Sequence, residues 1–269
     1  MSGAGFFETS DRTRLNVDVA GEGPPMIFLH GLCGDAGQTA EAFPAESGFR
    51  RITIEARGHG HSEPGTLQRL SIATFTNDVV AYIEKNLDAP VAIGGISMGA
   101  AISLRLAVKR PDLVRALAIA RPAWLTAPAP DNMIPNAEVG RLLTQLPLEE
   151  AKAAFLAGPV GERLAVDAPD NLASLVGFFL REPIAVTAAL LTAISNDGPD
   201  VTDADVARIA VPTLVIGHEQ DIIHPIAYAR ALANWIPAAR FVQITPKAES
   251  RTQYVADFRH AMGTFMKEL

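Results

Sequence analysis

Short apolar runs without polar alternation are the feature that most constrains the fold of this 269-residue chain. Met26-Ile-Phe-Leu29 and Thr213-Leu-Val-Ile216 are two such runs. Successive apolar positions suit strands that are covered on both faces, as in a parallel sheet. Patterns with helical spacing separate most of these runs. Strand–helix alternation of this kind predicts a doubly wound, mostly parallel α/β sheet.

The same reading assigns eight strands and four flanking helices. We expect strands at residues 5–9, 15–20, 26–30, 51–55, 91–96, 116–120, 213–217 and 241–245. The first two runs alternate more and lie close together in the sequence, which predicts an antiparallel hairpin at one edge. Helical patterns are expected at residues 71–87, 98–109, 226–235 and 253–267.

The stretch between the sixth and seventh strands interrupts this alternation. It contains no convincing strand; a proline-rich loop at 128–135 precedes helix-like segments at 137–146, 148–157, 160–165, 171–179 and 183–193. Ordinary packing helices would look alike in sequence, but the length favours a cap. We therefore predict a core of residues 1–123 and 208–269 with a helical cap of residues 124–207.

Composition excludes several classes of function. The net charge is −7 and the sequence pI is near 5.4, which argues against non-specific binding to nucleic acid or anionic membranes. The first residues lack an apolar run behind a basic head, and no stretch reaches the ~20 apolar residues of a membrane span. The single cysteine, Cys33, excludes an intrachain disulfide. We expect a cytoplasmic protein with a small-molecule substrate and no nucleic-acid or membrane partner; its oligomeric state is left open.

A Gly-x-Ser-x-Gly motif, Gly95-Ile-Ser97-Met-Gly99, stands between the expected strand at 91–96 and the helix at 98–109. A sharp turn there needs small residues on both sides of the serine, because side chains would meet neighbouring backbone. The turn would hold the Ser97 hydroxyl above the sheet, next to helix amides that can stabilise an oxyanion. The alternative is a plain glycine-rich turn, which the strand–turn–helix context disfavours.

In the order of its motifs the chain resembles the α/β-hydrolase-fold family over nearly its whole length. The matching segments are His30-Gly31, Arg57-Gly-His59-Gly, the serine motif, Gly217-x-x-x-Asp221 and a terminal helix. The resemblance implies an oxyanion hole formed by the backbone N–H groups of Leu32 and Met98. It also implies that Asp221 orients a catalytic histidine, and that His30 bonds loop backbone. A loop carboxylate that caps the next helix is the other interpretation of Asp221.

The family's histidine after the last strand is absent. That stretch reads Thr245-Pro-Lys-Ala-Glu249-Ser250, and the later His260 is expected on the outer face of the terminal helix. His224, in the Asp221 loop, is the best substitute base, and His218 and His61 are weaker candidates. Alternatively, His224 only packs or caps at a helix start. Ser97 could then act slowly with Glu249 or water, or the site could bind a ligand without turning it over.

These inferences predict a serine hydrolase, a carboxylesterase or lactonase that cleaves a small apolar ester through a Ser97 acyl-enzyme. The alternatives are a catalytically impaired, ligand-binding relative and a cofactor-free non-hydrolytic enzyme. No cofactor is implied, and His59-Gly-His61 lacks the further ligands of a metal site. Cap side chains that could line an apolar pocket are Phe155, Leu175, Phe178, Phe179 and Leu190.

Overall fold

The computed structural model describes residues 3–269, so residues 1 and 2 of the expected core lie outside the described part. One eight-stranded sheet, with strand order β1-β2-β4-β3-β5-β6-β7-β8, forms the centre of these residues. Its strands are β1 (Gly3–Glu8), β2 (Arg14–Ala20), β3 (Pro25–Leu29), β4 (Arg50–Ile54), β5 (Val91–Ile96), β6 (Val114–Ala120), β7 (Thr213–Gly217) and β8 (Ala239–Gln243).

The sheet is mostly parallel, as predicted. β1 pairs with β2 and β2 with β4 in antiparallel orientation, whereas β4, β3, β5, β6, β7 and β8 follow one another in parallel. The predicted antiparallel hairpin at one edge is therefore confirmed. Because the carboxyl ends of parallel strands meet at one edge of the sheet, the loops after β3, β5, β6 and β7 come together there.

Helices cover both faces of the sheet, which explains the unbroken apolar runs. Neighbouring residues of β3 belong to different hydrophobic clusters: Ile27 packs on one face and Phe28 on the other. The face of Ile27 is covered by α2 (Ile72–Asn86), α3 (Met98–Lys109) and α10 (Ile226–Trp235). The opposite face is covered by α1 (Ala36–Ala42) and α11 (Arg251–Met266).

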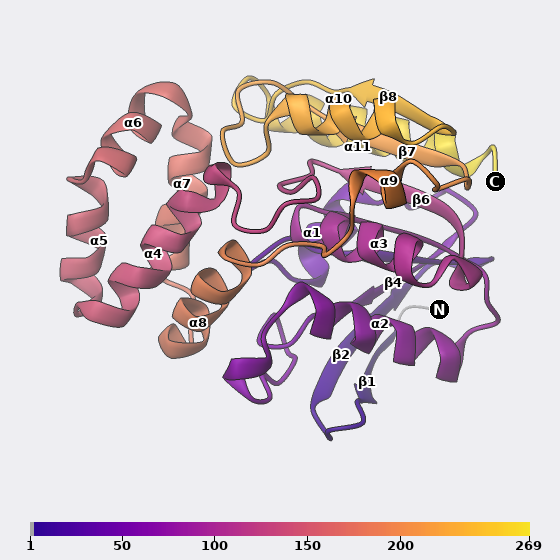
Figure 1. Ribbon diagram of the computed structural model, residues 1–269, viewed down its shortest axis with the longest axis horizontal. Coiled ribbons are helices and arrows are strands. Elements are labelled where there is room, and N and C mark those ends of the chain that lie inside the picture. Colours follow the sequence, from indigo (N-terminus) through magenta and orange to yellow (C-terminus); the bar gives the residue numbers. More distant parts are fainter. Residues whose placement is uncertain (1–2) are drawn as a thin grey trace.

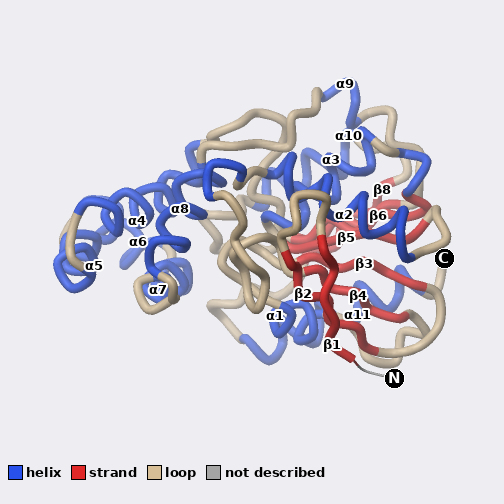
Figure 2. Tube along the Cα trace, turned by 90° about the horizontal axis from the view of Figure 1, so that it is seen from below, coloured by secondary structure: helices blue, strands red, loops and turns tan. Residues whose placement is uncertain are grey.

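A group of helices lies between β6 and β7 in the sequence and to one side of the sheet in space (Figure 1). Figure 2 shows the same separation from below. The helices are α4 (Ile134–Gln145), α5 (Leu148–Leu156), α6 (Pro159–Asp167), α7 (Pro169–Phe178) and α8 (Ile184–Ser195). The short α9 (Asp203–Val206) follows before β7. We call α4–α8 the helical insertion; its division from the core as a separate domain stays a prediction.

Three local expectations were wrong. The proline-rich segment is not all loop, because a 3₁₀ turn at Asp131–Met133 leads directly into α4, whose first turn accommodates Pro135. The helix α1 was not expected, since its small residues show little apolar periodicity. The last strand runs from Ala239 to Gln243 rather than from 241 to 245, because its partner β7 begins at Thr213, opposite Ala239, and ends at Gly217, opposite Gln243.

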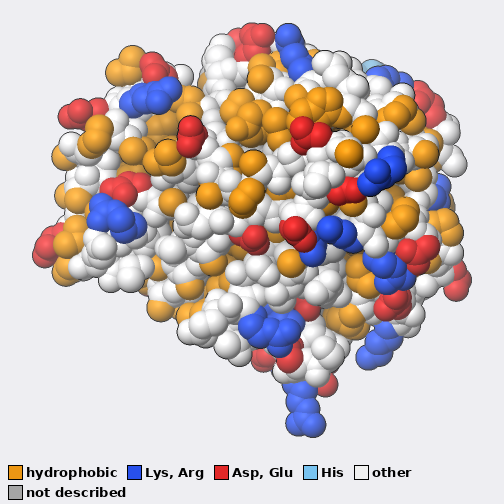
Figure 3. All heavy atoms as spheres, viewed as in Figure 1, with side chains coloured by type: hydrophobic (Ala, Val, Ile, Leu, Met, Phe, Trp, Pro, Cys, Tyr) orange, Lys and Arg blue, Asp and Glu red, His pale blue; other side chains and the backbone are white. Residues whose placement is uncertain are grey.

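In the view of Figure 3, acidic, basic and hydrophobic side chains are interspersed. Within residues 3–269, the helices are all too short or too polar to cross a membrane.

Candidate active site

Ser97 occupies a sharp turn between β5 and α3. Its φ of 55° and ψ of −110° lie in a region that non-glycine residues rarely adopt. A Cβ on Gly95 would lie 2.4 Å from the carbonyl carbon of Gly99, and one on Gly99 would lie 2.4 Å from the carbonyl oxygen of Leu29. The motif glycines are thus needed because strand, turn and helix backbones approach too closely for side chains.

The structure brings together Ser97, His224 and Asp221. The His224 Nε2 atom lies 2.9 Å from the Ser97 hydroxyl, and its Nδ1 atom lies 2.9 Å from Asp221 Oδ2. With the proton on Nδ1, the neutral ring donates to Asp221 and accepts from the Ser97 hydroxyl. Asp221 also accepts from the backbone N–H of His224 at 3.0 Å. The aspartate thus fixes both the backbone and the ring of the histidine three residues later.

Burial and charge set the protonation of this pair. Burial alone would raise the pKa of Asp221, but the neighbouring His224 and Arg121 outweigh it and hold that pKa well below its usual value. Burial lowers the pKa of His224; Asp221 opposes this and Arg121 adds to it, so the pKa stays below its usual value. At neutral pH the pair is therefore a carboxylate beside a neutral imidazole.

Arg121, the residue after β6, is a third ionisable group at this position. Its Nη2 atom lies 2.6 Å from Asp221 Oδ2 and 3.1 Å from His224 Nδ1. Its Nη1 atom donates to the Tyr254 hydroxyl at 3.3 Å. Because Nδ1 carries a proton when it bonds Asp221, it cannot also accept a hydrogen bond from Arg121. The guanidinium therefore acts on the ring through its positive charge. Nothing in the sequence indicated this pairing.

Two backbone N–H groups, one in the loop after β3 and one directly after Ser97, have no partners of their own among the described residues. Among residues 3–269, neither the N–H of Leu32 nor that of Met98 makes a hydrogen bond within the protein. Met98 begins α3, whose positive dipole end lies there. Gln38 accepts from the N–H of Gly31 at 2.6 Å and so braces the loop that carries Leu32.

The helical insertion is attached to the Asp221 loop by two asparagines. In α7, Asn171 Nδ2 donates to Asp221 Oδ1 at 3.0 Å, and Asn171 Oδ1 accepts from the N–H of Ile222 at 2.8 Å. Asn132, just before α4, donates to the carbonyl oxygens of Ile223 at 2.7 Å and Ala123 at 2.9 Å. Sequence analysis missed both, because their partners in the Asp221 loop lie at least 50 residues away and leave no local signal.

A cavity of about 240 Å³ adjoins Ser97 and His224. The insertion and Met133 just before it form part of the wall; the residues from the insertion are Asn136, Asn171, Ser174, Leu175 and Phe178. Leu175 and Phe178 were expected there. The expectation was wrong for Phe155, Phe179 and Leu190, which are buried between helices instead; Phe155 and Phe179 stack with ring centroids 5.8 Å apart.

Two larger hollows lie elsewhere. One of about 500 Å³ shares Gln38, Ile96, Arg121 and Lys247 with the Ser97 cavity and extends it towards α11. Another of about 740 Å³ opens at the β1–β2 edge and is lined by residues such as Phe6 and Tyr82, far in the sheet order from β5. The volume of a cavity does not by itself identify the active site, because Ser97 and His224 line the smallest of these three cavities.

The remaining candidate bases lie away from the serine. His218 Nδ1 donates to the Glu219 carbonyl at 2.7 Å, and its Nε2 atom is 3.5 Å from Asp221 Oδ2. His61 and His260 are exposed, and the exposed Glu249 accepts from Gln220. None of these side chains contacts Ser97 in the described part of the chain.

Two further loop residues, His30 and Cys33, are in surroundings that suit a structural role rather than a catalytic one. His30 donates from Nδ1 to the Gly31 carbonyl at 2.8 Å and accepts at Nε2 from the N–H of Ala56 at 3.0 Å, so it bonds loop backbone as expected. Burial raises the pKa of the Cys33 thiol to about 12, so the thiol stays protonated at neutral pH.

Comparison with known proteins agrees with this architecture. Residues 24–249 match the family described as alpha/beta hydrolase fold, and the chain belongs to that family. It is 32% identical over 238 residues to BpoC of Mycobacterium tuberculosis, whose name refers to non-heme bromoperoxidases; the match covers 86% of this chain and 88% of BpoC.

Solved structures of the same fold include an enol-lactonase and an esterase. The enol-lactonase from Burkholderia xenovorans LB400 superposes with a TM-score of 0.70 at 23% identity, covering 98% of this chain and 97% of that one. The esterase from Exiguobacterium antarcticum superposes with a TM-score of 0.73 at 20% identity, covering 97% and 98%. At these identities the likeness concerns the fold alone.

Proposed function

We propose that this protein is a serine hydrolase that cleaves carboxylic esters or lactones, with Ser97 as nucleophile, His224 as general base and Asp221 as the residue that orients His224. The observation that supports this most is the unbroken line of contacts from Ser97 Oγ through the His224 ring to Asp221, at 2.9 Å on each side. The names of an esterase and an enol-lactonase of the same fold agree with this reaction class.

In the first half of the reaction, His224 Nε2 takes the Ser97 proton as the oxygen attacks the substrate carbonyl. The N–H groups of Leu32 and Met98 would hold the resulting oxyanion, since both lack partners among the described residues. Collapse breaks the bond to the leaving oxygen, which receives the proton from His224. An acyl-Ser97 ester and a free alcohol result; for a lactone, the alcohol stays attached to the acyl group.

In the second half, His224 takes a proton from a water molecule that attacks the acyl-enzyme. The same two N–H groups hold the second oxyanion, and the Ser97 oxygen leaves with the proton from His224. Asp221 keeps the imidazole in the correct tautomer and stabilises the imidazolium of each step. The nearby guanidinium of Arg121 works against that cation.

Turnover of p-nitrophenyl acetate and butyrate by wild type and Ser97→Ala tests this function. The wild type should release p-nitrophenol well above the buffer rate, and Ser97→Ala should lose activity by a factor on the order of 10⁴. Ser174→Ala is a matched control, because its hydroxyl lines the same cavity but donates to the Asp170 carbonyl. Buffer-rate release by the wild type with both esters would overturn the proposal.

The same assay addresses the other interpretations. A catalytically impaired, ligand-binding relative was considered because the histidine after β8 is absent; the position of His224 beside Ser97 supports turnover instead. Wild-type and Ser97→Ala rates that are equal would favour the binding interpretation. A non-hydrolytic enzyme of this fold would not produce the carboxylic acid. Chromatography of the reaction mixture shows whether the acid is formed.

A further inference from the structure

The charged side chains that line the Ser97 cavity are both cations. Arg121 and Lys247 belong to its wall, whereas no carboxylate of residues 3–269 does. Arg121 is paired with Asp221 at 2.6 Å, and Lys247 is paired with a second aspartate at 3.1 Å. That second aspartate is Asp170, and neither of the two lines the cavity. A ligand in this cavity therefore meets the positive member of each pair.

Of the two cations, Lys247 is the one that a ligand can reach. Its side chain is 25% exposed, and within the described part of the chain its ammonium makes one hydrogen bond, to Asp170, so further donors are free. The Arg121 guanidinium is more enclosed, and its nitrogens are engaged with Asp221 and Tyr254. Arg121 therefore contributes positive charge to the wall, whereas Lys247 also offers free N–H groups.

Lys247 is held near the proposed base. It comes from the segment after β8 in which the expected histidine is absent, and a turn fixes this segment, because the carbonyl oxygen of Pro246 accepts from the N–H of Glu249 at 3.0 Å. Burial is the main cause of the lowered pKa of His224, and the positive charge of Lys247 adds to that lowering. The ammonium is thus close enough to the His224 ring to act on it.

The wall around Lys247 continues into the neighbouring hollow of about 500 Å³. The residues common to both cavities are Gln38, Ile96, Arg121 and Lys247. Gln38 already accepts from the Gly31 N–H through Oε1, and its Nε2 atom has no partner among the described residues. In the neighbouring hollow, the acidic Glu41 is paired with Arg251 at 2.8 Å. The side chains of the shared wall therefore offer donors, and no free acceptor, to a ligand.

We propose that the wall formed by Lys247, Arg121 and Gln38 is a carboxylate-binding site, and that the enzyme prefers esters or lactones that carry a carboxylate a few carbons from the ester group. This inference rests on the ester hydrolysis proposed above and specifies its substrate class, which the sequence suggested to be apolar. A carboxylate accepts charge-assisted hydrogen bonds from the free N–H groups of Lys247, and the two cations stabilise its charge. A neutral ester of the same length fills the cavity but gains neither.

Matched pairs of esters test this preference. Monomethyl succinate, monomethyl glutarate and monomethyl adipate carry the carboxylate at three distances on the acyl side. Their neutral partners are methyl 4-oxopentanoate, methyl 5-oxohexanoate and methyl 6-oxoheptanoate, in which a methyl ketone replaces the carboxylate at similar volume. The pair 4-acetoxybutyrate and 5-acetoxy-2-pentanone places the same groups on the alcohol side. Acid release is followed in a pH-stat at neutral pH, and each kcat/KM is divided by the ester's own rate with hydroxide.

For the wild type, the carboxylate ester of at least one pair should exceed its neutral partner by roughly 10-fold or more, as expected for a charge-assisted hydrogen bond. Lys247→Met should abolish this ratio, which does not depend on the fraction of active enzyme. Lys247→Arg keeps the charge and should retain a preference. Lys267→Met is the control: this lysine is exposed at the end of α11, outside both cavities, and the variant should keep the wild-type ratio.

Asp170 provides a test that distinguishes ligand binding from a structural role of the ion pair. Asp170→Asn removes the carboxylate that partly neutralises Lys247, so a binding role predicts a higher ratio than in the wild type. If the pair only holds α7 in place, breaking it from either side should have the same effect. A ratio that falls in both Lys247→Met and Asp170→Asn would therefore overturn the proposal.

The kinetic outcomes also separate this proposal from the proposed function. Equal normalised rates within all four pairs, or a preference that survives in Lys247→Met, would overturn the carboxylate site alone. Hydrolysis of none of the eight esters would overturn ester hydrolysis and the substrate class with it.

Discussion

The Arg121 guanidinium lies close to both Asp221 and His224, the proposed orienting residue and general base. It is 2.6 Å from Asp221 and 3.1 Å from His224 Nδ1, and it is nearly enclosed by protein. A cation so close to the imidazole disfavours its protonated form. Burial of the ring, with a smaller contribution from Arg121, therefore keeps His224 neutral and available as a base at lower pH than an ordinary histidine, whose pKa is about 6.5.

This predicts a pH effect that can be measured on the free enzyme. The acid limb of kcat/KM should lie below pH 6.5, since the pKa of His224 is lowered by burial and by Arg121 against the opposing effect of Asp221. Arg121→Met removes the cation, so the pKa of His224 should rise and the acid limb should move to higher pH. Activity would then be lost at mildly acidic pH where the wild type still works.

The control for that profile is Arg163→Met, at an exposed arginine on α6 whose one ion pair within residues 3–269 is with Asp167. Its acid limb should coincide with that of the wild type. An Arg121→Met profile that also coincides with the wild type would show that the guanidinium does not influence the histidine.

At the scale of elements, the predicted sheet depended on unbroken apolar runs and succeeded where both faces are covered. β5 and β7 are buried at every residue, and their bounds match the expected ones. β8 is an edge strand with only partly buried side chains, so its apolar pattern was weak and its start was misplaced. In α1, helix formation relies on Asp35, whose side chain accepts from the N–H groups of Gly37 and Gln38. That N-cap aspartate was the one available signal.

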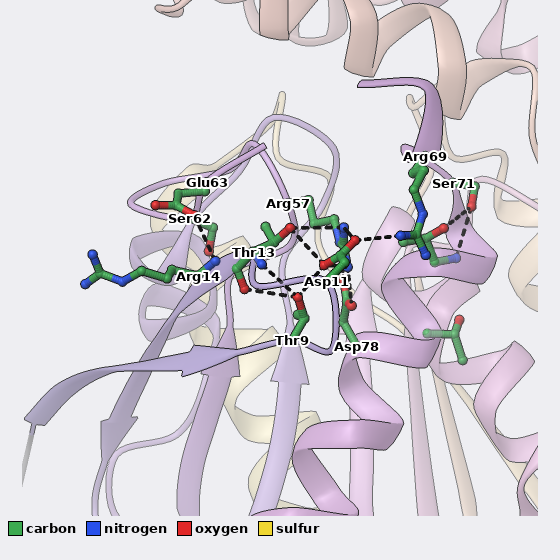
Figure 4. Close-up of polar contacts among 12 residues, drawn as sticks. Thr9, Asp11, Thr13, Arg14, Arg57, Ser62, Glu63, Arg69, Ser71 and Asp78 are labelled. Carbon is green, nitrogen blue, oxygen red and sulfur yellow. Dashed lines mark hydrogen bonds and ion pairs between the residues drawn. The ribbon is translucent and has the colours of Figure 1, made fainter. Parts of the chain in front are cut away.

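An ion cluster around the buried Arg57 connects three elements at the β1–β2 end of the sheet (Figure 4). Arg57, after β4, donates to Asp78 of α2 at 2.7 and 2.9 Å and to Asp11 of the β1–β2 turn at 2.7 Å. Hydrogen bonds from Arg57 hold the pKa of Asp11 well below its usual value, whereas burial raises the pKa of Asp78. Asp78 therefore depends on Arg57 to remain charged inside the protein.

Arg57→Met should destabilise the fold by about 3–5 kcal/mol, because it leaves a buried carboxylate without its partner. Urea unfolding followed by circular dichroism measures this loss. Adding Asp78→Leu to Arg57→Met should recover much of the stability, since an apolar pair replaces an ion pair at similar volume. An Arg57→Met midpoint equal to that of the wild type would show that the cluster does not support the fold.

The whole molecule assembles the candidate site from parts that are distant in sequence. Ser97 comes from the end of β5, Arg121 from β6, Asp221 and His224 from β7, and Asn171 from the insertion. Motif order was enough to predict Ser97, Asp221 and the fold. It could propose His224 only because this residue shares a loop with Asp221, since no spacing rule predicts that the ring turns towards the serine.

The asparagines in and near the helical insertion could not be predicted as site residues from the sequence. Asn171 and Asn132 contact the Asp221 loop across 50 and 91 residues of chain, and such contacts appear only when the sheet and the insertion are both folded. Asn136 is likewise an ordinary helix residue in sequence. Its burial in the cavity wall is a property of the assembled molecule.

The central claim is that the base comes from the aspartate's own loop, and the kcat/KM of His224→Ala with p-nitrophenyl butyrate tests it most directly. The control is His260→Ala, at an exposed position of α11. If His224 is the base, its removal should lower kcat/KM by a factor on the order of 10⁴, close to the effect of Ser97→Ala, while His260→Ala keeps the wild-type value. A His224→Ala enzyme with wild-type kcat/KM and an unchanged pH profile would contradict the account.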